Sequence, residues 1–425
     1  MRVAVVGAGP SGLAALRALT REGIDAVAFE KGERVGGVWT LEERPTAAYR
    51  TLHLITSRER TEFGEYPLPA GTPDYPSAQI IGAYLERYVE QYGLGDRIRL
   101  GAGVEHCERL ADGGWRVEGE EFSHLVIANG HNAVAKWPDP PYPGEFEGEQ
   151  VHALDYEDAE RFRGKRVMVV GMGNSAMDIA TDLSHSAQRT LLSVRHGSWV
   201  IPKRLLGQPA DQITSPWMAV HVPWKIRQPI SEALLKITVG SPERYGLPKP
   251  AHGLFEGHPT ITDTVLSRIS HGEIEPKPGI REFEGGSVRF TDGGAEEADA
   301  IVWCTGYVVE LPMLDPALVG GDPRELPLYK RVFHLDAPDL FFVGLMQSTG
   351  SAFPIVERQS QLVAERLTGR FALPSVPEMR ADVAKRRAAA VARWGERGRP
   401  GMRVDFDRFM YELGQELEAG RGRAA

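Results

Sequence analysis

The fold is decided by residues 2–12, which read Arg2-Val-Ala-Val-Val-Gly-Ala-Gly-Pro-Ser-Gly12. The valine-rich run is typical of a parallel strand that is buried on both faces. Three glycines follow with the spacing G-x-G-x-x-G, which joins such a strand to a helix around the pyrophosphate of a dinucleotide. We expect a helix from about Ser11 to Arg21 and a strand at residues 26–30, so the chain opens with a βαβ unit.

The same pattern recurs in the middle of the chain. A second apolar run at residues 166–171 leads into Gly171-Met-Gly-Asn-Ser-Ala176, in which alanine replaces the third glycine. The dinucleotide fingerprint accepts that alanine. A helix is expected at residues 175–183 and a strand at 190–194. The sequence therefore predicts an α/β protein with two Rossmann-like dinucleotide-binding domains.

The residue that ends the second strand of each unit indicates which dinucleotide that unit binds. Glu30 follows the first unit and Arg195, with His196, follows the second. A carboxylate accepts ribose hydroxyls and repels a 2′-phosphate, whereas arginine binds that phosphate through charge-assisted hydrogen bonds. We therefore expect FAD in the first domain and NADPH in the second. A solvated charge at a strand end is the alternative interpretation of Arg195.

A paired-glycine turn follows Glu30 and leads to Trp39, and its backbone is suited to lie against a flavin; a core position is the alternative for Trp39. The predicted FAD contacts are Gly7, Gly9, Pro10, Ser11, Gly12, Glu30, Gly37, Val38 and Trp39. The predicted NADPH contacts are Gly171, Gly173, Asn174, Ser175, Ala176 and Arg195.

The chain has 425 residues, which exceeds the roughly 250 to 300 residues at which one core stops growing. The segment 136–144 contains four prolines and is expected to connect domains. A strand at residues 300–304 suggests a return of the chain. We expect an FAD domain at 1–155 and 300–425, with the NADPH domain, 156–299, inserted into it.

Composition limits the partners. The net charge is −9, and no basic stripe with interleaved aromatics suggests nucleic acid. The two cysteines, Cys107 and Cys304, are far apart, which argues against a disulfide framework and a metal site. We expect no leader peptide, and the sequence has no run of roughly 18 apolar residues, so no membrane partner is expected. A cytoplasmic protein is expected, with a homodimer left open.

A longer motif lies between the connector and the second unit. It is Phe146-x-Gly-x-x-x-His152-x-x-x-Tyr156. This segment resembles the motif that identifies flavin-containing monooxygenases. In related Baeyer-Villiger enzymes the last position is typically tryptophan, so Tyr156 favours oxygenation of nitrogen or sulfur. The resemblance implies that His152 is a domain-linker element rather than a catalytic base.

The resemblance extends over most of the chain. Cys304-Thr-Gly-Tyr307 resembles the family's A-T-G-Y and implies cofactor contacts at Thr305 and Gly306, and Gln359 resembles a contact to the flavin edge. The family commonly has asparagine where this chain has Ile55, whose side chain forms no hydrogen bond. His53, Thr56 and Ser57 are candidates to replace that donor, and His53, Ile55 and Thr56 are the predicted catalytic positions.

By this resemblance the chain is expected to be an NADPH- and O2-dependent monooxygenase that oxygenates an amine or sulfide through a C4a-hydroperoxyflavin. Water must be kept from that adduct, but no side-chain acid or base is required. Two alternatives on the same scaffold are an NADPH oxidase and a decarboxylating or ketone-directed, Baeyer-Villiger-like oxygenase. A non-enzymatic flavoprotein that binds a partner is the alternative from another class.

Overall fold

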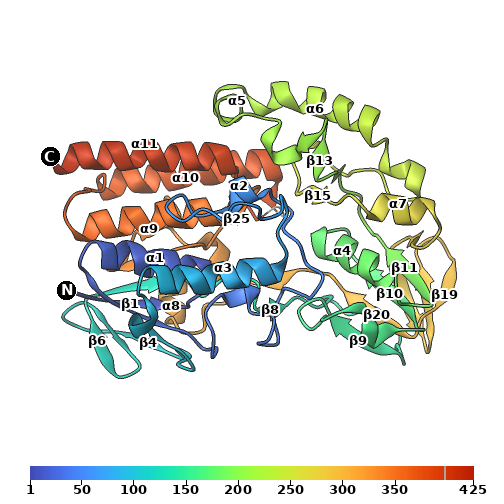
Figure 1. The fold of residues 1–425 in the computed structure, drawn as a ribbon, viewed down its shortest axis with the longest axis horizontal. Coiled ribbons are helices and arrows are strands. Elements are labelled where there is room, and N and C mark those ends of the chain that lie inside the picture. The colour runs from blue at the N-terminus through green and yellow to red at the C-terminus, as the bar shows by residue number, and fades with distance from the viewer. Residues whose placement is uncertain (397–398) are drawn as a thin grey trace. The chain divides into compact units, whose positions relative to one another are not determined.

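The computed structural model describes residues 1–396 and 399–425, which form two compact units (Figure 1). Unit 1 comprises residues 1–43, 56–131 and 309–425, and unit 2 comprises residues 44–55 and 132–308. The chain therefore leaves unit 1 and returns to it twice. The predicted boundaries at 155 and 300 differ from these, because residues 44–55, 132–155 and 300–308 all lie in unit 2.

Unit 1 is built on a seven-stranded sheet in the order β22-β23-β24-β7-β1-β2-β3. The parallel strands are β1 (Arg2–Val6), β2 (Asp25–Phe29), β3 (Ile98–Arg99), β7 (His124–Ile127) and β24 (Leu340–Phe342). Two antiparallel strands, β22 (Leu328–Tyr329) and β23 (Phe333–His334), complete one edge. Val3, Ala4 and Val5 are fully buried, as the apolar run predicts for a strand covered on both faces.

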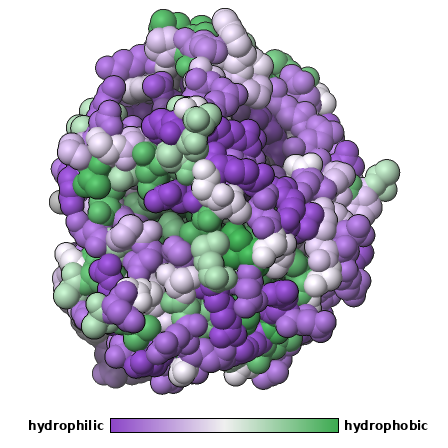
Figure 2. Space-filling model, turned by 90° about the vertical axis from the view of Figure 1, so that its left-hand side faces the viewer, coloured by the Kyte–Doolittle hydropathy of each residue, from purple (hydrophilic) through white to green (hydrophobic). Residues whose placement is uncertain are grey.

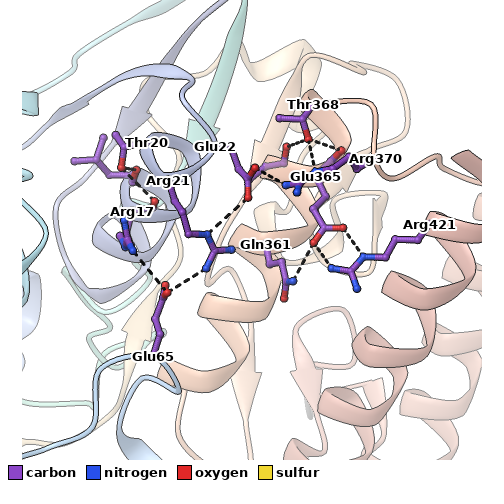
Figure 3. A network of polar contacts seen from close by, with 12 residues as sticks. Arg17, Thr20, Arg21, Glu22, Glu65, Gln361, Glu365, Thr368, Arg370 and Arg421 are labelled. Carbon is purple, nitrogen blue, oxygen red and sulfur yellow. Dashed lines mark hydrogen bonds and ion pairs between the residues drawn. The ribbon is translucent and has the colours of Figure 1, made fainter. Parts of the chain in front are cut away.

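Five longer helices accompany this sheet, and α1 packs on α9, which in turn packs on α11. They are α1 (Pro10–Arg21), α3 (Ala78–Gln91), α9 (Phe353–Leu367), α10 (Val376–Trp394) and α11 (Phe406–Ala424). Figure 3 shows polar contacts of the α1 arginines with Glu65, and contacts between α9 and α11. Glu365, 3% exposed, accepts hydrogen bonds from Arg421 and Gln361, so the pairing of α9 with α11 includes a buried carboxylate.

Unit 2 contains a five-stranded, wholly parallel sheet in the order β16-β11-β10-β20-β9. Its strands are β9 (Glu149–His152), β10 (Arg166–Val170), β11 (Arg189–Ser193), β16 (Glu275–Lys277) and β20 (Ala300–Trp303). Alternate residues of β10 face two separate cores: Val167 and Val169 one, Met168 and Val170 the other. The predicted strand near 300 is thus real, but it belongs to this sheet.

The helices of unit 2 are α4 (Asn174–Leu183), α5 (Pro216–His221), α6 (Trp224–Thr238) and α7 (Val265–Ser270). A three-stranded antiparallel sheet is formed by β17 (Ile280–Glu284), β18 (Ser287–Phe290) and β19 (Ala295–Glu297). On α6, Leu235 packs into a small core, whereas Ile226, Ile230 and Ile237 are exposed. The segment after Lys203, for which the sequence predicts no role, is therefore a helical element with one apolar face uncovered.

The remaining pairs are short. In unit 1 they are β4 (Cys107–Arg109), β5 (Trp115–Val117) and β6 (Glu120–Phe122), with β25 (Gln347–Ser348) beside β26 (Arg403–Val404). In unit 2 they are β8 (Val134–Ala135) with β21 (Tyr307–Val308), β12 (Val200–Ile201) with β15 (Thr260–Ile261), and β13 (Arg204–Leu205) with β14 (Gln208–Pro209). Two very short helices, α2 (Arg58–Thr61) and α8 (Pro316–Val319), complete unit 1.

The surface agrees with the charged composition. The face drawn in Figure 2 is mostly hydrophilic, with hydrophobic residues in small groups between polar ones. Among residues 1–396 and 399–425, we find no helix with the length and apolar character needed to span a membrane.

Candidate functional site

The first glycine-rich turn connects β1 to α1 in unit 1. Gly7 has φ +101°, and a Cβ there would lie 2.6 Å from the Ala128 carbonyl oxygen. A Cβ on Gly12 would lie 1.8 Å from the Gly7 carbonyl oxygen. Both glycines are therefore required by the packing of the protein itself.

Gly9 is different. It has an ordinary φ of −74°, and a Cβ on it would lie 3.5 Å from its nearest neighbour, the Cα of Gly37. No side chain caps the N-terminus of α1 and no acidic residue lies in its first turn, while Pro10 takes the first position. Uncapped N–H groups at a helix start attract a phosphate. Gly9 thus leaves open the approach to an anion-binding helix terminus.

Glu30 follows β2 and is 8% exposed. Its Oε2 accepts a hydrogen bond from the Ala8 backbone N–H at 2.7 Å, and its Oε1 accepts one from the Gly32 N–H at 2.9 Å. Each carboxylate oxygen retains a second lone pair. The carboxylate is therefore fixed beside the glycine turn with acceptor capacity left for hydroxyl groups.

The paired-glycine turn lies against the same place. Gly37 has φ +59°, and a Cβ on it would lie 3.0 Å from the Cα of Gly9. It begins a short 3-10 helix that also contains Val38 and Trp39. The Trp39 ring meets the Phe353 ring edge-on at 6.5 Å between centroids. The turn therefore contacts Gly9 within unit 1, and its contact with a flavin stays a prediction.

Gln359 has a more confined setting than expected. Its side chain is fully buried on α9, and its Oε1 accepts from the Gly344 backbone N–H at 3.0 Å. Its Nε2 donates to the carbonyl oxygens of Lys330 and Arg331 at 3.4 and 3.3 Å. Both of those residues have positive φ, so the amide holds an unusual turn together. A flavin contact by Gln359 stays a prediction.

In the second glycine-rich turn, in unit 2, one glycine is again required by packing and another is not. Gly171 has φ +140°, and a Cβ there would lie 2.7 Å from the Cys304 carbonyl oxygen. The same Cβ would lie 3.4 Å from that of Ala176, which therefore fits the third position. Gly173 precedes α4, and a Cβ on it would have no neighbour within 4 Å. No side chain caps α4, so unit 2 has a second open helix terminus.

A cavity of about 550 Å³ adjoins this turn. Its wall includes Gly171 and Met172 of the turn, then Arg195 and His196 after β11. The rest of its lining comes from Cys304, Thr305, Ser193, Val170, Gly279, Ile280 and residues 136–143. Arg195 is exposed, and no carboxylate of the described residues forms an ion pair with it. The cavity therefore offers an uncommitted guanidinium beside the second glycine turn.

The other predicted cofactor contacts of unit 2 differ in their environments. Asn174 Oδ1 accepts from the Ile261 N–H at 2.7 Å, and Ser175 is half-buried at the start of α4. Thr305 donates its hydroxyl to the Lys136 carbonyl oxygen, and Gly306 accepts from the Lys136 N–H at 3.0 Å. Thr305 and Gly306 thus hold the proline-rich segment to the cavity wall. The sequence predicts that segment as a connector and gives no sign of its place in a cavity.

The three predicted catalytic positions are divided between the units. His53 and Ile55 lie in unit 2, and Thr56 lies in unit 1. His53 Nδ1 lies 3.0 Å from the Thr51 carbonyl oxygen, while the buried Thr56 hydroxyl lies 2.7 Å from that of Thr61. The side chain of Ile55 is half-buried. The chain therefore crosses from one unit to the other within the predicted catalytic segment.

The motif of residues 146–156 packs into the cores of unit 2. A Cβ on Gly148 would lie 2.7 Å from the Asp299 carbonyl oxygen, so only glycine fits there. His152 is fully buried, its Nδ1 accepts from the Leu154 N–H at 3.0 Å, and burial lowers the pKa of its imidazole. Tyr156 donates its hydroxyl to Asp182 at 2.6 Å. These contacts fit the linker role that the sequence assigns to His152.

Two further groups of unit 2, Asp178 and Cys304, have raised pKa values. Asp178, on α4, accepts from the Tyr49 hydroxyl at 3.1 Å, and burial raises the pKa of its carboxyl. Cys304 lies in the cavity wall, and burial raises the pKa of its thiol. No local pattern marks Asp178. In the part of the chain that the structure describes, no group of three metal-ligating side chains is found.

Comparison with known proteins agrees with this geometry. A family model described as "Flavin-binding monooxygenase-like" matches residues 1–421. Human "Flavin-containing monooxygenase 5" is 32% identical over 438 residues, covering 97% of this chain and 82% of that protein. "Dimethylaniline monooxygenase [N-oxide-forming] 2" of Pan troglodytes is 30% identical over 455 residues, covering 98% and 83%.

The fold also has solved counterparts. The structure of S-allyl-L-cysteine S-oxygenase from Allium sativum superposes with a TM-score of 0.72 and 25% identity. The match covers 99% of this chain and 88% of that one. The arrangement of two dinucleotide-binding folds, one inserted into the other, is thus shared with a known oxygenase.

Proposed function

The chain belongs to the flavin-binding monooxygenase-like family, and on that premise we propose that it uses NADPH and O2 to oxygenate an amine nitrogen or a sulfide sulfur of a small molecule. As a member it is an FAD-dependent monooxygenase that takes electrons from NADPH. We further propose that the substrate is a soft nucleophile, and we propose which residues bind each cofactor.

One observation carries the proposal. Gly9 and Gly173 occupy the same place in two separate units, and neither is required by contacts within the protein, unlike Gly7 and Gly171. A residue without a side chain is useful there if a ligand approaches the backbone. Because both following helices also lack a side-chain cap, two pyrophosphate sites fit the chain better than one.

The two sites differ in charge, which supports their assignment. Glu30 offers fixed acceptors to the ribose hydroxyls of FAD. Arg195, with His196 beside it in the cavity wall, offers donors to the 2′-phosphate of NADPH. When bound, FAD supplies the redox chemistry, taking a hydride from NADPH and activating O2. The work of the protein is to bind and orient both cofactors and to exclude water.

The nature of the substrate rests on two supports. The motif ends in Tyr156 rather than the tryptophan typical of Baeyer-Villiger enzymes. The printed names of two relatives also describe N-oxide formation and S-oxygenation. Attack by a nitrogen or sulfur lone pair needs no side-chain base, which agrees with the lack of a catalytic triad in the sequence.

The predicted catalytic residues are kept with a refined role. His53 Nδ1 lies 3.0 Å from the Thr51 carbonyl oxygen, and an imidazole ring carries a donor N–H in either tautomer. Thr56 already shares its hydroxyl with Thr61, and Ile55 cannot hydrogen-bond. We infer that His53 replaces the usual asparagine donor. The lack of paired cysteines supports a reducing compartment, the cytoplasm, as the location.

The decisive test is stopped-flow absorbance after anaerobic reduction with NADPH and mixing with O2. We expect a transient species whose spectrum is neither that of oxidised nor that of reduced flavin, and its decay should accelerate when thioanisole or N,N-dimethylaniline is added. Direct return to oxidised flavin with stoichiometric peroxide, with and without these compounds, would contradict the proposal and favour an NADPH oxidase.

A further inference from the structure

Residues 44–55 are joined to unit 2 although the chain on both sides of them belongs to unit 1. At the centre of this segment Tyr49 is 2% exposed, and its hydroxyl donates to Asp178 Oδ2 at 3.1 Å. Asp178 lies on α4, about one turn after the helix begins at Asn174. The contact thus links the segment that carries His53 and Ile55 to the helix that follows the second glycine turn.

Further contacts hold the first half of the segment. The Arg44 guanidinium donates to the carbonyl oxygens of Tyr156 and Ala48 at 2.9 and 3.1 Å. The Arg50 N–H donates to the Glu157 carbonyl oxygen at 3.0 Å. The Tyr49 ring also meets the Tyr156 ring edge-on at 5.8 Å. These bonds reach the linker motif, whereas the Tyr49 hydroxyl reaches the nucleotide helix.

Burial and neighbouring charged groups affect the pKa values of both partners in the Tyr49–Asp178 hydrogen bond. Burial is the largest influence on Asp178 and raises the pKa of its carboxyl, while Lys203, the Tyr49 hydroxyl and His53 favour its charged form. Asp182, one turn further along α4, opposes them. Burial and the neighbouring Asp178 raise the pKa of Tyr49, so its hydroxyl remains a donor at neutral pH. A buried hydrogen bond to a carboxylate is worth more than an exposed one.

We propose that Tyr49 and Asp178 are positioning residues, whose hydrogen bond fixes His53 and Ile55 relative to the start of α4. Helix α4 would then position both NADPH and the segment that contains His53 and Ile55. Removal of the bond should disturb the reaction with O2 more than it disturbs NADPH binding. This inference rests on the proposed function for its kinetic consequence, but its structural part stands alone.

The experiment compares Tyr49→Phe with Tyr245→Phe in the holoenzyme. Tyr245 is a matched control, because its hydroxyl also donates within unit 2, to the Val239 carbonyl oxygen at 3.0 Å, but on another element. Two quantities are measured: peroxide released per NADPH consumed in the presence of thioanisole, and the rate of trypsin cleavage after Arg50, mapped by mass spectrometry. Arg50 is 62% exposed, and Arg44 is protected from trypsin by Pro45.

We expect Tyr49→Phe to be cleaved after Arg50 roughly two- to ten-fold faster than the control, the range expected for one net hydrogen bond. Peroxide per NADPH should rise, with the KM for NADPH changed less than about two-fold. Asp178→Asn retains an acceptor oxygen and should lie between wild type and Tyr49→Phe, which also provides the measurement if Tyr49→Phe folds poorly.

Cleavage and peroxide yields equal to those of Tyr245→Phe would overturn the proposal, as would a loss of NADPH affinity that accounts for the whole effect. Failure of the proposed function looks different: the wild type would make only peroxide. The cleavage rates would then still decide whether Tyr49 and Asp178 hold the segment.

Discussion

Glu30 and Ala8 are joined by a 2.7 Å hydrogen bond, in which the Ala8 backbone N–H donates to the Glu30 carboxylate. The bond connects the end of β2 to the glycine turn after β1, two places that lie 22 residues apart. The acidic residue that the sequence assigns to a ligand therefore also shapes the turn that would receive it.

For this reason we predict that Glu30→Ala lowers flavin content more than the loss of ribose contacts alone would. The N–H groups of Ala8 and Gly32 lose their acceptor, which costs about 1–3 kcal/mol for each buried group. The dissociation constant for FAD should rise by roughly 10- to 100-fold or more, measured as the flavin-to-protein absorbance ratio after gel filtration. Glu86→Ala removes an exposed carboxylate of unit 1 and serves as the control; full flavin content in Glu30→Ala would contradict the assignment.

Gly173→Ala should separate binding from folding. A methyl group there meets no protein atom within 4 Å, so the free energy of unfolding should change by less than about 1 kcal/mol. The KM for NADPH should nevertheless rise at least about ten-fold, because the methyl group stands between the helix terminus and the pyrophosphate. Thermal unfolding and steady-state kinetics measure the two effects.

Gly171→Ala provides the contrast for that prediction. Its Cβ would lie 2.7 Å from the Cys304 carbonyl oxygen at φ +140°, so this variant should be strongly destabilised. If Gly173→Ala bound NADPH like the wild type, the second turn would not be the pyrophosphate site.

Arg195→Ala should raise the KM for NADPH far more than the KM for NADH. Charge-assisted hydrogen bonds to the 2′-phosphate contribute about 1.5–3 kcal/mol, which corresponds to roughly 10- to 150-fold. NADH has no such phosphate, so its KM should change little. Arg268→Ala, which breaks an ion pair with Glu273 in the same unit, is the control. Equal changes for both nucleotides would rule out this role.

Two histidines with lowered pKa values predict sensitivity to acid. Burial, aided by the Arg399 cation, lowers the pKa of His131 to about 4, and burial also lowers the pKa of His152. The unfolded chain, with histidine pKa values near 6.5, binds more protons than the folded one between pH about 4 and 6.5. Stability is therefore complete above about pH 6.5 and is lost as the pH falls through this window, by up to about 1.4 kcal/mol per pH unit for each histidine.

Urea unfolding at pH 7 and pH 5 measures this dependence. His131→Gln should reduce the difference between the two midpoints, while the exposed His106→Gln should leave it unchanged. An unaltered difference in His131→Gln would mean that the acid sensitivity has another source.

The sequence predicts the two nucleotide folds well because their signals are local. The helix expected from Ser11 spans Pro10–Arg21, and the strand expected at 190–194 spans Arg189–Ser193. Continuous apolar runs and glycine spacing depend on neighbours within a few residues.

The rest depends on contacts between distant residues. Tyr49 and Asp178 are 129 positions apart, and no periodicity joins them. The proline-rich segment signals an interruption of regular structure, yet only the fold gives it a place in the cavity wall. Gln359 matches a family position, while its three backbone partners come from two other segments. Long-range packing determines these roles, and a local motif does not predict it.

The division of unit 1 into three stretches of chain has a consequence for biosynthesis. Unit 2 has all of its residues once position 308 has left the ribosome, whereas β24, which flanks β7 in unit 1, is made only afterwards. During translation the edge of β7 stays unpaired until β24 has been made, and exposed strand edges can pair wrongly. The fold that the chain starts first is thus the one it finishes last, and nascent chains stopped after residue 308 would be the form most dependent on chaperones.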